Sequence, residues 1–119
     1  MAIDLPTLRS LLDVIGGDVA DLQELIDDFQ TTAPDLVSTI RQGHDDGDTK
    51  AMRIAAHTLK SNARDFGALE LAELCGRLEK LCQEGGGIGA GPLVAEIARA
   101  ESEARRALAE LRAGDVQNG

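Results

Sequence analysis

His57 lies in a segment where basic side chains recur at helical spacing. At about 100° per residue, a helix through this segment places its apolar residues on one side and His57 on the opposite side. The apolar side consists of Met52, Ala55, Leu59, Ala63 and Phe66. The histidine side carries Lys50, Arg53, Lys60 and Arg64, with Ser61 one turn after the histidine. No acidic residue shares this stripe, so the pattern predicts an exposed histidine in a locally positive environment.

An exposed histidine among cations is suited to phosphoryl chemistry. A neutral imidazole has a nitrogen lone pair that can attack an activated phosphoryl group. The resulting phosphoimidazole carries about two negative charges, which neighbouring Lys and Arg side chains would stabilise. The same pattern is compatible with an ordinary solvent-exposed histidine, or with a basic surface for an acidic partner. The spacing alone leaves these three interpretations open.

The composition of the whole chain limits the other possibilities. The formal net charge of −9, from 12 Lys and Arg against 21 Asp and Glu, disfavours binding to nucleic acid or to an anionic membrane surface. Aromatic residues make up only 2% of the 119 residues, too few to stack on bases. No apolar run reaches the roughly 18 residues that span a membrane, and the beginning of the chain lacks the pattern of a signal peptide. We therefore expect a cytoplasmic protein.

Glycines divide the chain into five predicted helices within a single domain over residues 1–119. The predicted segments are 5–15, 18–42, 48–66, 69–83 and 92–113. The expected N-caps are Asp4, Asp18 and Asp48. Pro34 is expected to kink the second helix, and Cys75 and Cys82 are expected in the core. Four amphipathic helices with short connections predict an all-α fold, an antiparallel up-down four-helix bundle with the short first helix as a lid.

Three other polar segments are predicted not to form sites. The acidic run 44–48 lacks the ligand spacing and the closing Glu of a calcium loop, so we expect an interhelix turn and no metal site. The glycines of segment 85–91 lack the Lys-Ser/Thr ending of a phosphate-binding loop. The acidic residues of the fourth helix are expected on a solvated face, with no pairing that would make an acid and a base: Glu73, Glu79 and Glu84.

Two stretches of the chain resemble a known protein family. The run 56–63, Ala-His-Thr-Leu-Lys-Ser-Asn-Ala, followed by Phe-Gly-Ala at 66–68, is similar to the signature of histidine-containing phosphotransfer (HPt) domains. That signature is approximately Ala-His-x-Leu-Lys-Gly-Ser-Ala, then a hydrophobic residue and Gly-Ala. Residues 71–79 are similar to the Leu-Ala-x-x-Cys-x-x-Leu-Glu of the next helix in that family. Helix order and lengths agree with the resemblance over the whole chain.

The resemblance implies roles for particular residues. His57 would be the phosphorylated histidine, and Lys60 would contact the phosphoryl oxygens. Ser61 occupies a position that is usually Gly, where a receiver domain approaches closely, so this departure bears on docking geometry and partner preference. Asn62 replaces the usual Ser and keeps a polar donor. The residues expected to contact a partner are Arg53, Ile54, Ser61 and Arg64.

The function that the resemblance implies is relay of a phosphoryl group between receiver-domain aspartates through phospho-His57 in a two-component phosphorelay. The expected partners are response-regulator receiver domains and a hybrid histidine kinase. Any Mg²⁺ would be bound by the receiver, and the chain itself would need no cofactor. We expect a monomeric phosphoryl carrier without kinase activity of its own.

Two alternatives of other classes remain open. The first is a helical-bundle docking module that binds a receiver domain or a kinase without being phosphorylated. The second is an enzyme, such as a phosphohistidine phosphatase or a metal-dependent hydrolase. An enzyme would need a second polar cluster or a bound metal near His57.

Overall fold

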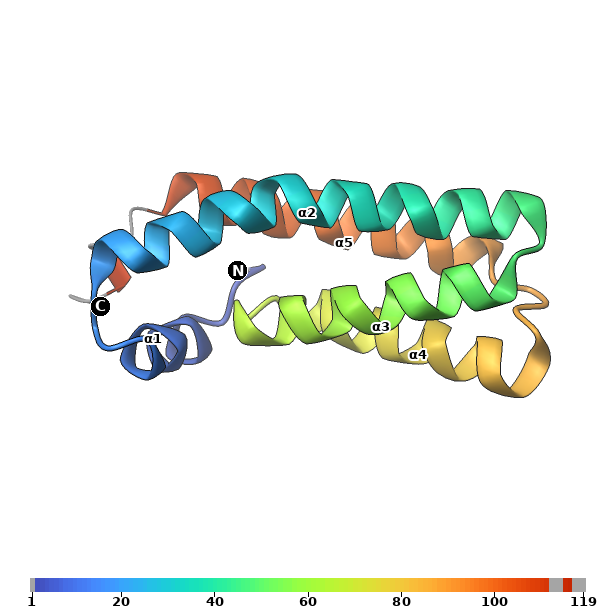
Figure 1. The fold of residues 1–119 in the computed structure, drawn as a ribbon, viewed down its shortest axis with the longest axis horizontal. Helices are drawn as coiled ribbons and strands as arrows, with labels where there is room; N and C mark the ends of the chain where they lie inside the picture. The colour runs from blue at the N-terminus through green and yellow to red at the C-terminus, as the bar shows by residue number, and fades with distance from the viewer. Residues whose placement is uncertain (1, 112–114, 117–119) are drawn as a thin grey trace.

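The chain folds into a bundle of long helices (Figure 1). The computed structural model describes residues 2–111 and 115–116, and these contain no strand. The helices are α1 (Leu5–Val14), α2 (Val19–Asp46), α3 (Thr49–Asp65), α4 (Leu69–Gly85) and α5 (Gly91–Glu110). Helices α2 and α5 lie in one layer over α3 and α4, and α1 lies at one end of the bundle. The prediction of an all-α, antiparallel four-helix bundle with an additional N-terminal helix is therefore confirmed.

The core is aliphatic because the chain supplies almost no aromatic residues. Each bundle helix contributes apolar residues at spacings of three and four, the period that keeps them on one face. The two phenylalanines, Phe29 and Phe66, contact each other with ring centroids 4.9 Å apart. Cys75 and Cys82 are buried free thiols, as predicted.

The junction between α2 and α3 differs from the prediction. The expected helix end at residue 42 and the turn expected over 44–48 are wrong, because α2 continues to Asp46 and ends at Gly47 with φ of 70°. Gly43 lies inside the helix and is buried against the start of α3. A Cβ on Gly43 would lie 3.1 Å from the Asp48 carbonyl oxygen and 3.1 Å from the Met52 nitrogen. This glycine therefore permits close helix packing rather than ending the helix.

The other helix ends lie within two residues of the predicted ones, except for the end of α5. Helix α1 ends at Val14, α3 is one residue shorter at each end, α4 extends to Gly85, and α5 begins at Gly91. Helix α5 ends at Glu110, because Leu111 has an extended backbone, so the predicted helix is wrong at residue 111; residues 112 and 113 lie outside the described residues. Helix α2 is continuous through Pro34, and the kink expected there stays a prediction.

Aspartate side chains fix where α1, α2 and α3 begin. Asp4 accepts a hydrogen bond from the Thr7 backbone N–H, Asp18 from those of Ala20 and Asp21, and Asp48 from that of Ala51. Each bond satisfies a donor that the first helical turn leaves free, so the predicted N-caps are confirmed. The cap at Asp48 sets the start of the helix that carries His57.

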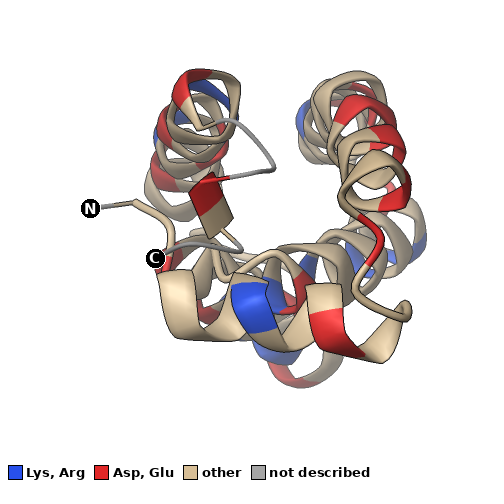
Figure 2. Cartoon of the chain, turned by 90° about the vertical axis from the view of Figure 1, so that its left-hand side faces the viewer, with Lys and Arg blue, Asp and Glu red and all other residues tan. Residues whose placement is uncertain are grey.

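Charge is distributed unevenly over the bundle. Viewed from the end that carries α1, acidic residues follow one another along α2 (Figure 2). In contrast, α3 carries four basic residues and a single acidic one, Asp65. No helix in the described part of the chain is long and apolar enough to cross a membrane.

Candidate functional site

Helix α3 presents His57 to solvent. The buried residues of α3 are Met52, Ala55, Ala56, Leu59 and Ala63, which pack into the bundle. His57 points away from this set, and its side chain is 58% exposed. The helical period of the apolar residues thus places the imidazole on the surface, on the helix with the highest share of basic residues.

The site also contains an acidic residue from the neighbouring helix. Glu79 on α4 reaches the imidazole, with Oε2 2.6 Å from His57 Nδ1. Its other oxygen, Oε1, accepts a hydrogen bond from Lys60 Nζ at 2.5 Å. The expectation that Glu79 lies unpaired on a solvated face is therefore wrong, because its side chain is only 13% exposed and its carboxylate bridges two residues of α3.

The Glu79 carboxylate defines which nitrogen of the imidazole carries the proton. A carboxylate can only accept hydrogen bonds, so Nδ1 is the donor and holds the N–H in the neutral ring. Nε2 then carries the lone pair, and it makes no hydrogen bond to any described residue. The exposed ring therefore offers Nε2 as a nucleophile.

Lys60 and His57 keep Glu79 ionised. The hydrogen bond from the Lys60 ammonium, opposed by burial and supported by the hydrogen bond from His57, holds the pKa of the Glu79 carboxyl below its ordinary value of 4.5. The carboxylate is consequently negative at neutral pH. Lys60 is half-buried at 20% side-chain exposure, so its ammonium is partly screened from bulk water.

His57, Lys60 and Glu79 form a triad, and the other predicted surface residues of α3 surround it. Ile54 is 48% exposed, so this apolar side chain faces solvent. Ser61 and Arg64 are exposed, and Arg53 is half-buried. Within the described ranges, neither Arg53 nor Arg64 forms an ion pair, so both guanidinium groups remain available to a ligand or partner.

The interior beneath the triad is apolar and closely packed. Cys75 lies under the Lys60–Glu79 pair, and burial raises the pKa of its thiol to about 12. Gly76 follows it in α4, and a Cβ at this position would lie 3.5 Å from Lys60 Cδ. Helix α4 therefore supports the Lys60 stem from below and supplies Glu79 at its edge.

Comparison with known proteins identifies the family to which this chain belongs. The family model described as Hpt domain matches residues 24–114, most of the chain and all of the triad. The chain belongs to the Hpt domain family. Members of this family are phosphocarrier intermediates rather than classical enzymes, and the match supports a histidine phosphotransfer role in two-component phosphorelays.

Solved structures share the Hpt fold. The crystal structure of histidine-containing phosphotransfer protein B (HptB) from Pseudomonas aeruginosa has a TM-score of 0.81 at 24% identity, covering 99% of this chain and 96% of that chain. The HPT domain of a sensor hybrid histidine kinase from Shewanella has a TM-score of 0.69 at 21% identity, covering 91% of this chain and 98% of that chain. No curated protein gives a significant match.

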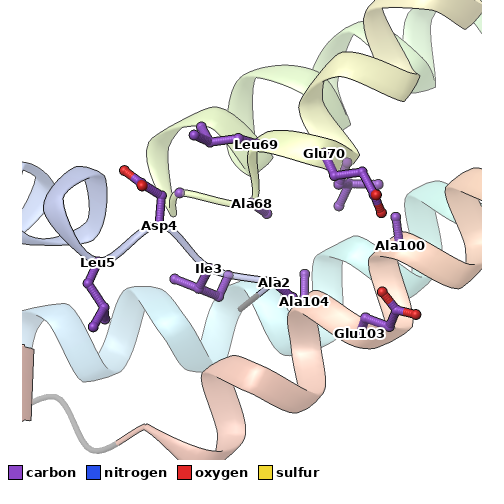
Figure 3. A pocket seen from close by; sticks show the side chains of 12 residues that line it. Ala2, Ile3, Asp4, Leu5, Ala68, Leu69, Glu70, Ala100, Glu103 and Ala104 are labelled. Atoms are coloured by element: carbon purple, nitrogen blue, oxygen red, sulfur yellow. The ribbon is translucent and has the colours of Figure 1, made fainter.

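This Hpt domain also has a cavity that none of the triad residues lines. About 650 Å³ of space lies between the N-terminal segment, the α3–α4 corner and α5 (Figure 3). Its acidic residues already have partners: Glu70 and Glu103 both pair with Arg99, at 3.1 and 3.0 Å, and Asp4 accepts a hydrogen bond from the Thr7 backbone N–H. Among the described residues, no group of three or more His, Cys, Asp or Glu could hold a metal ion.

Glu79 is the one residue of the triad that sequence reasoning missed. A helical wheel of α3 shows only neighbours on the same helix, whereas Glu79 is 22 residues away. The available signal was the Leu-Glu pair at 78–79 that ends the second stretch similar to the family. Leu78 is fully buried, so the next residue lies at the edge of the α4 interface.

Proposed function

We propose that this Hpt protein accepts a phosphoryl group on His57 Nε2 and passes it on to an aspartate of a receiver domain. The observation that carries the proposal is the hydrogen bond between Nδ1 and Glu79. It leaves Nε2 with a lone pair on an exposed ring, beside the Lys60 ammonium. The chain has only two histidines, and the other, His44, lies in the last turn of α2 without such an arrangement.

The transfer step follows from these positions. A receiver domain supplies an aspartyl phosphate together with its bound Mg²⁺. The Nε2 lone pair forms a bond to phosphorus while the bond from phosphorus to the aspartyl oxygen breaks, and the electron pair stays on the aspartate. The Nδ1 proton remains on the ring, so the histidine becomes a phosphoimidazolium. Lys60 stabilises the charge on the phosphoryl oxygens, a contribution that positioned cations make in such reactions. The second transfer is the reverse of the first, with a different receiver.

The partner would dock over the exposed face of α3. Hpt domains interact with receiver domains and with hybrid kinases. Ile54 offers an apolar contact next to His57, while Arg53 and Arg64 complement the acidic residues that hold Mg²⁺ in a receiver. Ser61 in place of the usual Gly adds a hydroxyl at the closest approach. We further propose that the protein is a cytoplasmic monomer, has no kinase activity of its own and needs no cofactor.

The test is phosphorylation by a phosphorylated receiver domain or a small phosphoramidate, followed by detection of acid-labile, base-stable phosphate. Wild type should be labelled and His57→Gln should not. His44→Gln is the matched control, because it removes the only other histidine and should keep the label. If folded wild type takes no label from several donors yet binds a receiver, the protein is a docking module and the relay function is wrong.

A further inference from the structure

The Glu79 carboxylate contacts both groups that a phosphoryl group on His57 would depend on. Oε2 lies 2.6 Å from Nδ1, and Oε1 lies 2.5 Å from Lys60 Nζ. Formation of the phosphohistidine needs only a free Nε2 and a cation. The tight contact of an ionised carboxylate with the opposite ring nitrogen therefore has a consequence beyond orienting the ring.

The hydrogen bond between Nδ1 and Glu79 affects the leaving group when the phosphoryl group is passed on. When Nε2 attacks phosphorus, the ring keeps its Nδ1 proton and gains a positive charge. In the onward transfer the bond between Nε2 and phosphorus breaks, and its electron pair returns to the ring. If Nδ1 still holds its proton, the departing group is neutral imidazole. If the proton has been lost to solvent, the departing group is an imidazolide anion, which is a far poorer leaving group.

We propose that Glu79 sets the rate at which phospho-His57 gives up its phosphoryl group, by retaining the proton on Nδ1. The inference rests on the proposed function of His57. An anionic acceptor binds a cationic ring more strongly than a neutral acceptor does, because a charge-assisted hydrogen bond is roughly twice as strong as a neutral one. Glu79 is thus a positioning residue that acts through the histidine and does not contact phosphorus.

Other charged groups around the ring do not supply this effect. On α3, the ring is flanked by the cations Arg53, Lys60 and Arg64, which oppose a positive ring. On α4, Cys75 is neutral at physiological pH because burial raises its pKa to about 12, and Lys80 is a further exposed cation. Glu79 is the only described residue that forms an ion pair or a hydrogen bond with the imidazole. It alone favours the protonated ring.

The experiment compares loss of phosphate from phosphorylated wild type and from Glu79→Gln between about pH 5 and pH 8, the range over which imidazole titrates. Both proteins are loaded with a phosphoramidate and purified, and inorganic phosphate and transfer to a receiver are followed. The amide oxygen of Gln can still accept the Nδ1–H bond, so the variant removes the charge and keeps the geometry. At pH 8 the variant should lose phosphate about tenfold more slowly, the factor expected for the excess strength of a charged hydrogen bond. The two rates should converge as the pH falls, because solvent then supplies the Nδ1 proton in both proteins.

Lys60→Gln is the second variant, because removing Glu79 also releases Lys60. If the slower loss in Glu79→Gln came from a freed Lys60 holding the phosphate, the Lys60→Gln/Glu79→Gln double variant would lose phosphate as fast as Lys60→Gln alone. The inference instead expects the double variant to stay slower than Lys60→Gln at pH 8. Equal rates for wild type and Glu79→Gln at all pH values would overturn it, as would a difference independent of pH, or a folded variant that takes no label. If wild type itself takes no label, the proposed function fails.

Discussion

Asp4 and Gly67 are in direct backbone contact where the N-terminal segment meets the α3–α4 corner. The Asp4 backbone N–H donates to the Gly67 carbonyl oxygen at 2.7 Å, and Gly67 has φ of 80°. A Cβ on Gly67 would lie 2.5 Å from the Asp4 carbonyl oxygen, closer than atoms can approach without displacement. This contact fixes the start of α1 against the C-terminal end of α3, the helix that carries His57.

Gly67→Ala should therefore destabilise the bundle by about 2 kcal/mol or more, from backbone strain and from the clash with Asp4. Gly16→Ala is the control, because Gly16 also has positive φ, at 95°, but a Cβ there meets nothing within 4 Å. Urea unfolding followed by circular dichroism measures both. Equal losses for the two variants would show that the close approach to Asp4 does not contribute.

The buried thiols should be unreactive in the native protein. Burial raises the pKa of Cys75 to about 12 and also raises the pKa of Cys82, so neither forms much of the reactive thiolate at neutral pH. A thiol reagent added to the folded protein at pH 7.5 should modify both cysteines only at the rate of unfolding. Rapid modification of the native protein, compared with a sample in denaturing urea, would contradict the burial of these side chains.

The ion pair of Glu79 should make a pH-dependent contribution to folding. Its pKa is lowered from 4.5 in the folded state, so its stabilisation is fully present above pH 4.5 and is lost as the pH falls through the lower folded-state value. Glu79→Gln should lower the free energy of unfolding by no more than about 1 kcal/mol at pH 7, which is typical of a partly exposed ion pair. The difference from wild type should vanish at acid pH. A cost that stays constant down to pH 2 would mean that packing, not charge, is lost.

Lys60 should matter for transfer more than for folding. Lys60→Gln is expected to slow phosphoryl transfer to His57 by about tenfold or more, since it removes the ammonium that shares the Glu79 carboxylate with His57. The exposed Lys80 on α4 makes no ion pair with any residue that the structure describes, and Lys80→Gln provides a control of equal charge change. Stopped-flow transfer from a phosphorylated receiver measures the rate. Similar slowing in both variants would indicate a general effect of net charge on docking.

Ser61 should limit how closely a partner approaches α3. Ser61→Gly is expected to tighten binding to a receiver that phosphorylates the wild type, while lowering stability by about 0.5–1 kcal/mol because glycine is unfavourable within a helix. Opposite signs for binding and stability distinguish a docking effect from a folding effect. Titration calorimetry and urea unfolding provide the two measurements, and weaker binding would contradict the role assigned to this position.

Features that depend on neighbours along the chain follow from the amino-acid sequence alone. The apolar period of residues 52–66 places His57 on the outer face of α3, and Asp4, Asp18 and Asp48 mark helix starts through hydrogen bonds that span two or three residues. These contacts are local, so spacing alone predicts them. The resemblance to the family signature added the role proposed for His57, from the same short run of residues.

Contacts that cross between helices depend on how the helices pack against one another. The sequence predicts that the second helix ends at residue 42, yet Gly43 lies inside α2 because α3 packs closely against it. Glu79 was read as a solvated acid, yet its carboxylate joins His57 and Lys60. Both depend on the rotation and axial register of one helix against another. That register is set by the simultaneous packing of the apolar faces of all four bundle helices, which no single stretch of sequence contains.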